Sequence, residues 1–312
     1  MILSAVGLQT HIWNNNLKSL LLLICFPALI LLMMFVGAMI YFYNYFDAYY
    51  RSLDFIKANW YTVFTAVLAW FTLAFFFHQS FVNLMSGGRL ANRNSYTRIY
   101  NLLENLCISR GITMPKLFII NNSALNAFAS GLGKKTYSIT LTQGLIDNLD
   151  DEELEAVLGH ELTHIINHDT RLLIVCVIFV GTIAFFAKII FSRSGLRLLR
   201  GIKGRAAIIV LIIAVVSIPG YLIASLLRCS LSRKREYLAD AGSVELTKNP
   251  DAIIRALQKI SGHAAITKMP SDISQMCIER TEPKSSFFGL FASHPPIEDR
   301  IAVLQEYAGA SK

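Results

Sequence analysis

Charged residues are scarce in this chain. Asp, Glu, Lys and Arg make up 16% of its 312 residues, against about 25% in soluble domains, and the mean hydropathy is +0.47. This composition argues against an ordinary soluble protein. Glycine (18) and proline (8) are also few and apolar residues reach 54%, which excludes disordered and collagen-like chains. The net charge of +8 suits nucleic acid or a membrane surface. The hydrophobicity favours the lipid bilayer and no nucleic-acid partner.

Paired cysteines are also lacking. No two of the five cysteines stand in the CxxC spacing of a zinc or redox motif. Neither a disulfide framework nor a cysteine zinc site is indicated. Two of them, Cys25 and Cys176, lie inside long apolar runs.

Long apolar runs predict four transmembrane helices. A run of about 20 residues crosses a hydrocarbon core of about 30 Å, and such runs cover residues 19–43, 60–82, 172–191 and 206–227. The third run is the weakest, because Lys188 lies inside it near one end, where its side chain can snorkel. The first run is too long for a signal peptide and lacks a small-residue cleavage site, so we interpret it as a retained anchor.

These spans divide the chain into four segments. An N-terminal transmembrane hairpin (1–82) precedes a first polar block (83–171), and a second hairpin (172–227) precedes a second polar block (228–312). An even number of spans separates the polar blocks, so both lie on one side of the membrane and can fold together into one domain of ordinary size. We predict a mainly α membrane protein that carries an α+β domain with a small sheet.

The local pattern of the polar blocks gives a coarse secondary structure. Short strands are predicted at 115–120, 125–129 and 136–141. Helices are predicted over 95–109, after a capping box formed by Asp150 and Glu153, from Pro250 and from Pro296. The stretch 268–289 has no clear period and is predicted to be a mobile loop.

The predicted capped helix carries His160-Glu161-Leu162-Thr163-His164, an HExxH sequence. Residues four apart share a helix face, so His160 and His164 can both offer an imidazole to one zinc ion, while Glu161 can hold a water against the metal. The alternative is a surface helix with two incidental histidines. The motif's place on a capped amphipathic helix favours the zinc site.

A catalytic zinc needs a third protein ligand, and several positions are candidates. The metzincin pattern requires a histidine six residues after the motif, where this chain has Thr170. His168 is a poor ligand, because a third residue along one straight helix diverges from the metal. Glu236 would complete a His2Glu set, and Asp240, on the same helix face, would bond the second ring nitrogen of His160. The alternative for Glu236 is neutralisation of a basic juxtamembrane cluster.

The histidine and glutamate candidates His164 and Glu236 lie equally far along the chain from their neighbouring spans. His164 lies eight residues before Leu172, where the third span begins, and Glu236 lies eight residues after Arg228, which follows the fourth span. In continuous helices each ligand would stand about 12 Å above the same membrane surface. A transporter or channel predicts no such match.

These motifs together resemble the HtpX-type integral-membrane zinc metalloproteases, HExxH gluzincins related to the CAAX prenyl endopeptidases. The similar segments are 160–164, 236–240, Asn126-Ala127-Phe128-Ala129, Leu141-Thr142-Gln143-Gly144-Leu145 and Ser293-His294-Pro295-Pro296. The resemblance implies a gluzincin-like metallopeptidase domain with one Zn²⁺ per subunit. It also implies a multi-pass protein of the bacterial plasma membrane, with its active site in the cytoplasm, that degrades damaged or misfolded membrane proteins under stress. The N-terminal lead is longer than in the commonest form of the family.

The proposed roles follow from this resemblance and from the motif. Glu161 is the expected general base, acting beside a zinc held by His160, His164 and Glu236. The resemblance assigns His294 to the oxyanion; the alternative is a histidine in a turn before the last helix.

The segment from Asn126 to Ala129 is expected to be an edge strand that pairs with the substrate backbone. The alternative is an ordinary core strand.

Two other classes of function compete with a protease. A transporter predicts ionisable residues inside the spans, where only Lys188 and His78 qualify, both near ends. A non-catalytic zinc-binding scaffold or chaperone would keep the zinc ligands but would not need Glu161. The loop 192–205 is basic without an acid, so charge alone would place it in the cytoplasm, whereas the resemblance places the opposite side there. Oligomerisation is compatible with the sequence.

Overall fold

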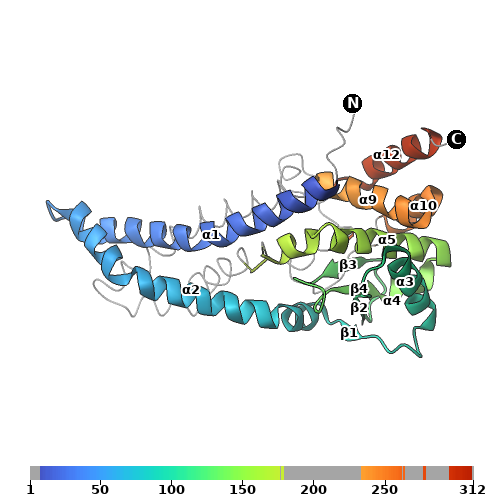
Figure 1. The fold of residues 1–312 in the computed structure, drawn as a ribbon, viewed down its shortest axis with the longest axis horizontal. Helices are drawn as coiled ribbons and strands as arrows, with labels where there is room; N and C mark the ends of the chain where they lie inside the picture. The colour runs from blue at the N-terminus through green and yellow to red at the C-terminus, as the bar shows by residue number, and fades with distance from the viewer. Residues whose placement is uncertain are drawn as a thin grey trace. The chain divides into compact units, whose positions relative to one another are not determined.

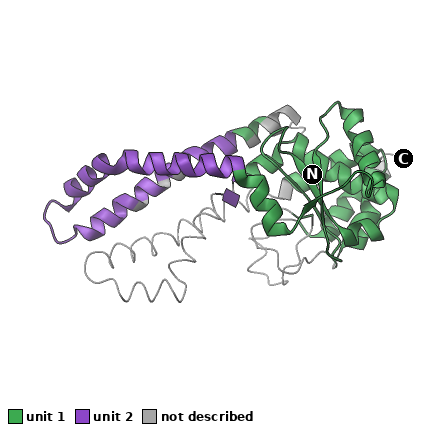
Figure 2. Ribbon diagram, turned by 90° about the horizontal axis from the view of Figure 1, so that it is seen from below, with its two compact units in different colours: residues 1–16, 77–174, 228–312 green, residues 17–76, 175–227 purple. Residues whose placement is uncertain are grey.

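The computed structural model of the chain describes residues 8–175, 177–178, 233–261, 263, 277–278 and 295–310 (Figure 1). The chain divides into two compact units (Figure 2). Unit 1 comprises Met1–Asn16, Phe77–Ile174 and Arg228–Lys312, and unit 2 comprises Leu17–Phe76 and Val175–Leu227. The two predicted polar blocks fall almost entirely in unit 1.

Two long helices form the described part of unit 2 and continue into unit 1. They are α1 (Leu8–Tyr41), which contains Pro27, and α2 (Ala48–Ser86). Within the described residues, α2 is the one helix long and apolar enough to cross a bilayer; Ile30–Tyr41 is a shorter apolar stretch. The large apolar side chains of α2 are exposed, including Trp60, Phe64, Leu68, Phe75 and Phe76.

The third and fourth predicted spans lie outside the described residues, except for 172–175 and 177–178. The described residues have the predicted mostly helical architecture with a small sheet. The number of four spans stays a prediction.

A mixed four-stranded sheet forms one layer of unit 1. Its strands are β1 (Arg89–Leu90), β2 (Lys116–Ile120), β3 (Ala127–Ser130) and β4 (Ser138–Thr142), in the order β1-β2-β4-β3. β2 and β4 are parallel, and the other two pairs are antiparallel. Three strands lie within about two residues of the predicted ranges. β1 was not predicted, because two residues are too short to show a period.

Several of the described helices of unit 1 begin or end at local signals in the sequence. The helices are α3 (Thr97–Arg110), α4 (Gln143–Asn148), α5 (Asp151–Ile166), α9 (Arg233–Thr247), α10 (Pro250–Ile260) and α12 (Ile297–Ala310). α5 has the predicted capping box between Asp150 and Glu153. Pro250 is at the first position of α10, whose N-cap is Asn249. The left-handed Gly111 ends α3.

Helix α5 is the centre of the unit. It packs against β3, α3, α10 and α9, and its buried side chains join one continuous hydrophobic core with those of the sheet and the other helices. α9 approaches α5 closely because small residues line the contact. A Cβ at Gly242 would lie 2.4 Å from Thr163 Cγ2, and the Ser243 hydroxyl donates to the Ala156 carbonyl at 2.6 Å. This close approach brings the α9 side chains to the HExxH face of α5.

Candidate metal centre

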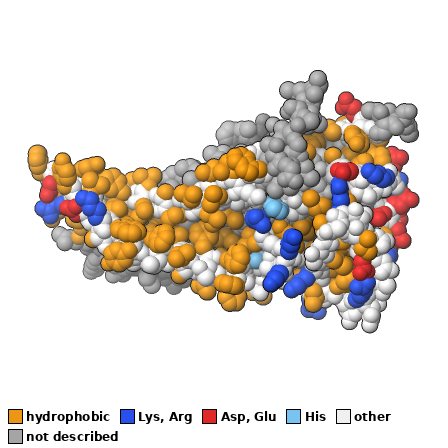
Figure 3. Space-filling view, viewed as in Figure 1, with side chains coloured by type: hydrophobic (Ala, Val, Ile, Leu, Met, Phe, Trp, Pro, Cys, Tyr) orange, Lys and Arg blue, Asp and Glu red, His pale blue; other side chains and the backbone are white. Residues whose placement is uncertain are grey.

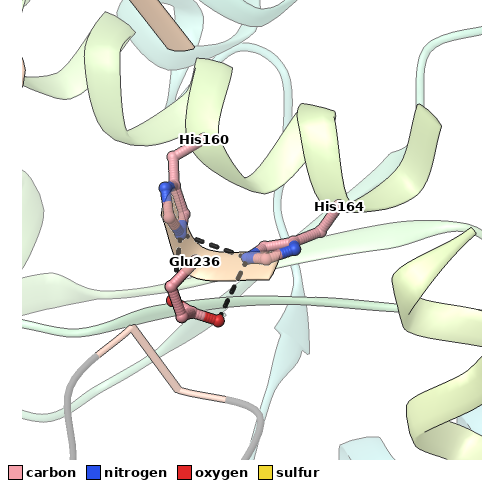
Figure 4. Close-up of side chains that lie close together, drawn as sticks. All are labelled: His160, His164 and Glu236. Atoms are coloured by element: carbon pink, nitrogen blue, oxygen red, sulfur yellow. Dashed lines mark hydrogen bonds and ion pairs between the residues drawn. The ribbon is translucent and has the colours of Figure 1, made fainter. Parts of the chain in front are cut away.

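Two histidines of α5 face the same point. His160 and His164 are one turn apart, and their Nε2 atoms lie 3.1 Å from each other (Figure 4). The ring planes are nearly perpendicular, at 88°. His160 is fully buried, whereas the side chain of His164 is 15% exposed. The pair is thus open to solvent on one side only.

Glu236 of α9 completes the cluster. Its Oε2 lies 3.7 Å from His160 Nε2, and its Oε1 lies 3.7 Å from His164 Nε2 (Figure 4). One ligand atom from each of the three residues lies within 4.8 Å of the others. The structure therefore brings together the three residues that the sequence analysis selected as zinc ligands, from helices separated by about 70 positions in the chain.

Each histidine has a carboxylate behind it. His160 Nδ1 lies 3.0 Å from Asp240 Oδ1, and His164 Nδ1 lies 3.0 Å from Asp169 Oδ2. The first contact was expected from the sequence. The partnership of Asp169 was missed, because it depends on a turn that the sequence pattern does not reveal.

That turn occurs at His168, which has a positive φ of 59°, an uncommon conformation for a residue other than glycine. It turns the chain out of line with α5, so Asp169 points back to His164. The His168 ring instead contacts the Asn16 side chain at 3.1 Å. His168 is thus directed away from the cluster, as expected.

The donor set fits a metal cation. When His160 and His164 each donate a hydrogen bond from Nδ1–H to a carboxylate, their Nε2 atoms are unprotonated and carry lone pairs. These lone pairs face one another beside the Glu236 carboxylate. Such an arrangement needs a positive charge between the three groups. Two neutral imidazoles and a carboxylate are a common ligand set of catalytic zinc, with carboxylates fixing the histidine tautomers.

Arg300 of α12 is a functional residue that sequence reasoning missed. Its guanidinium is completely buried and donates to both oxygens of Asp240, through Nη2 at 2.6 Å and Nε at 2.9 Å. Its Nη1 also donates to the Ile278 carbonyl at 3.2 Å and lies 3.6 Å from Glu236 Oε2. In the sequence Arg300 is one basic residue in a mixed-charge helix, so nothing marks it as buried.

The electrostatics of the centre follow from this burial. Burial alone would raise the pKa of Asp240, but Arg300 and His160 outweigh it and hold the pKa below the ordinary value. Burial alone would lower the pKa of His160, but contacts with Asp240 and Glu236 raise it to about 9. The cluster thus attracts positive charge, whether as a proton or as a metal ion.

Glu161 lies beside the cluster, and its pKa is shifted in the opposite direction to that of Asp240. It is buried, and burial is the main reason that its pKa lies above the ordinary value, although the two histidines oppose this. Its carboxyl group also interacts with the backbone of Ala129 in β3. A carboxyl group with a raised pKa is suited to accept and return a proton near neutral pH.

The remaining predicted site residues that the structure describes are Asn126, just before β3, and Ala127, Phe128 and Ala129 of β3. β3 is one of the two edge strands of the sheet. Part of its free edge already has partners in the chain: Leu125 N donates to His263 O, and Ile278 N donates to Ala127 O, both at 2.9 Å. The Asn126 side chain accepts from Ile278 N at 3.0 Å. His294 lies outside the described residues.

The fold and the centre define the class of protein: an HExxH metallopeptidase. Residues 94–308 match peptidase family M48, and the chain belongs to this family. It is 43% identical over 321 residues to a "Protease HtpX homolog" of Bacteroides fragilis, covering 97% of this chain and 99% of the relative. A "Protease HtpX homolog" of Streptococcus equi subsp. zooepidemicus is 38% identical over 219 residues, covering 68% of this chain and 74% of the relative.

Among solved structures, a crystal structure of S. mikatae Ste24p matches with a TM-score of 0.43 and 19% identity, covering 94% of this chain and 66% of that chain. The family match and the HtpX homologues confirm the resemblance to HtpX-type metalloproteases, and the protein is a membrane metalloprotease of family M48.

Proposed function

We propose that this chain is a zinc-dependent endopeptidase with one Zn²⁺ per subunit. It hydrolyses peptide bonds of misfolded or damaged membrane proteins at the cytoplasmic face of a bacterial plasma membrane, as part of the response to stress. The observation that carries the proposal is the convergence of His160, His164 and Glu236 beside a buried Glu161. The family supports the peptidase chemistry, and the donor set supports zinc as the metal.

The residues of the centre divide the chemical work. A zinc ion held by His160, His164 and Glu236 would supply the Lewis acid that polarises the carbonyl group of the scissile peptide. Glu161 takes a proton from the attacking water and passes it to the leaving amine nitrogen. His294 donates a hydrogen bond to the developing oxyanion, as in the expectation drawn from the family resemblance.

The segment from Asn126 to Ala129 serves as the substrate-binding edge in this proposal. Backbone groups of an antiparallel edge strand point outward at every second residue, and the outward groups of Leu125 and Ala127 are bonded within the chain. Ala129 is the next outward position, and its backbone lies against Glu161. We therefore assign the main-chain contact nearest the scissile bond to Ala129. Asn126 holds the neighbouring Ile278 in place.

A zinc-binding scaffold or chaperone is the second candidate. Such a protein would need the ligands but not Glu161. Burying a carboxyl group costs free energy, so a buried carboxyl group that is not itself a ligand is expected where it serves the chemistry. Glu161 is buried next to the ligands. The burial of this group favours the peptidase.

The proposed function is tested with the purified full chain in detergent and an unfolded protein such as β-casein. We expect cleavage that a zinc chelator abolishes and added Zn²⁺ restores. Cleavage that persists in the chelator would contradict the zinc mechanism. Absence of cleavage by the zinc-loaded protein would favour the scaffold.

A further inference from the structure

Acidic residues are unevenly distributed in unit 1. The 42 residues from 105 to 146 contain no Asp or Glu, whereas Asp or Glu occupies six of the nine positions from 147 to 155. The acidic run surrounds the start of α5, and in Figure 3 acidic side chains gather at the right-hand margin, over that end of the helix. The acid-free stretch includes three exposed lysines: Lys116, Lys134 and Lys135.

These three lysines lie at one end of the sheet. Lys116 begins β2 and pairs in register with Ser138 at the start of β4. Lys134 and Lys135 are in the turn between β3 and β4, and Tyr137 of that turn accepts a hydrogen bond from Lys116 N at 3.0 Å. No ion pair involves these lysines within the described part of the chain. We call this surface the basic turn.

Two of the connections between unit 1 and the apolar runs lie at this end of the sheet. Ser130, the last residue of β3, donates to the Gln79 side chain of α2 at 3.1 Å. The long apolar stretch of α2 precedes Gln79 in the chain. Arg171 donates to the Leu132 carbonyl at 3.0 Å, and the apolar run that begins at Leu172 follows directly. The basic turn therefore lies beside two chain segments that lead into long apolar runs.

We propose that Lys116, Lys134 and Lys135 contact the headgroups of anionic phospholipids. Lysines close to an anionic bilayer are attracted to it, each by a factor of about five in affinity. The contact fixes the orientation of unit 1, so that the metal centre faces substrate segments beside the bilayer. A nucleic acid would have to reach the same lysines between two chain segments that enter the membrane, so lipid is the occupant that the position favours.

This proposal rests on the membrane location of the protein and not on peptide hydrolysis. Its test is hydrogen exchange of the backbone amides 131–137 in the full chain. The protein is reconstituted in nanodiscs of phosphatidylcholine alone or of phosphatidylcholine mixed with phosphatidylglycerol. We expect exchange to be roughly fivefold slower or more with phosphatidylglycerol, and the difference to shrink in high salt.

Charge reversal supplies the controls. The variant Lys134→Glu/Lys135→Glu should lose the slowing. Lys248→Glu should keep it, because Lys248 is next to Asn249, which bonds Glu152 at the acidic end. Equal exchange in the two lipids, or slowing that survives the double reversal, would overturn the proposal. The same slowing by inorganic phosphate or by a short RNA in phosphatidylcholine nanodiscs would also overturn it, since a lipid surface would then not be the specific partner.

Discussion

Three side chains behind the proposed metal ligands hold those ligands in place. Asp240 and Asp169 each fix one histidine, and Arg300 fixes Asp240. None of the three is a ligand. They act through the ligands by setting ring orientation and charge, a role that usually changes metal affinity by about 10- to 100-fold.

Replacement of Arg300 by Met leaves the buried Asp240 without its main partner. We expect the free energy of unfolding to fall by about 3 to 5 kcal/mol and zinc affinity to fall as well. Arg300→Lys, which keeps the charge without the two-pronged contact, should be intermediate in zinc affinity. These quantities are measured by thermal unfolding in detergent and by competition with a zinc chelator.

The matched control is Arg255→Met. Arg255 pairs with the exposed Glu152 at 2.7 Å, where solvent screens the interaction, so the unfolding midpoint should hardly change. Equal effects of the Arg255 and Arg300 substitutions would refute the role assigned to Arg300.

Asp169 is the second test at this scale. Asp169→Asn preserves the size of the side chain but removes the charge that orients His164, so we expect zinc affinity about 10- to 100-fold lower. The measurement is zinc competition on the purified variant. Unchanged affinity would mean that the contact with His164 does not position the ligand.

At the residue scale, the sequence predicts which side chains of a single helix share one face. His160, Glu161 and His164 follow from helical spacing alone, and Glu236 with Asp240 from the same spacing on a second helix. Asp169 depends on the positive φ of His168, and Arg300 depends on the packing of α12 against α9. Neither leaves a periodic signal.

At the scale of the elements, the contact between helices α5 and α9 brings the two histidines and Glu236 together. It depends on Gly242, which lies against Thr163. Helix propensity alone predicts that Gly242→Ala stabilises α9 by about 1 kcal/mol. The added Cβ would overlap Thr163, and overpacking costs about 1 to 3 kcal/mol, so the packing effect dominates.

We therefore expect Gly242→Ala to lower both the unfolding midpoint and zinc affinity, because Glu236 moves with α9. Gly133→Ala is the control, since nothing lies within 4 Å of the added Cβ there. A Gly242→Ala protein with wild-type zinc affinity would show that the helix contact tolerates a larger separation.

The elements themselves were largely predictable. Capping residues and Pro250 set helix starts, and alternation with turn residues set three strands. The pairing along the free edge of β3 was not predictable, because its partners at His263 and Ile278 are more than 130 residues away in sequence. Such contacts arise from the tertiary fold.

At the scale of the whole molecule, the protein combines a membrane anchor with a polar catalytic unit. The proposed four-span arrangement, with unit 1 on the cytoplasmic side, predicts that the basic loop 192–205 lies on the outer side. We expect an added protease to cut this loop in cells with a permeabilised outer envelope and to leave it intact in everted membrane vesicles. The opposite pattern would mean that the basic loop follows the positive-inside rule and that the arrangement is inverted or that the second hairpin does not cross.

The central claim is that Glu161 performs chemistry beside a metal held by His160, His164 and Glu236. Its most direct test compares the zinc content and β-casein cleavage of the wild type with those of Glu161→Gln. The account predicts equal zinc in both proteins and cleavage lower by at least about 100-fold in the variant. Cleavage by Glu161→Gln at the wild-type rate, with zinc bound, would contradict it.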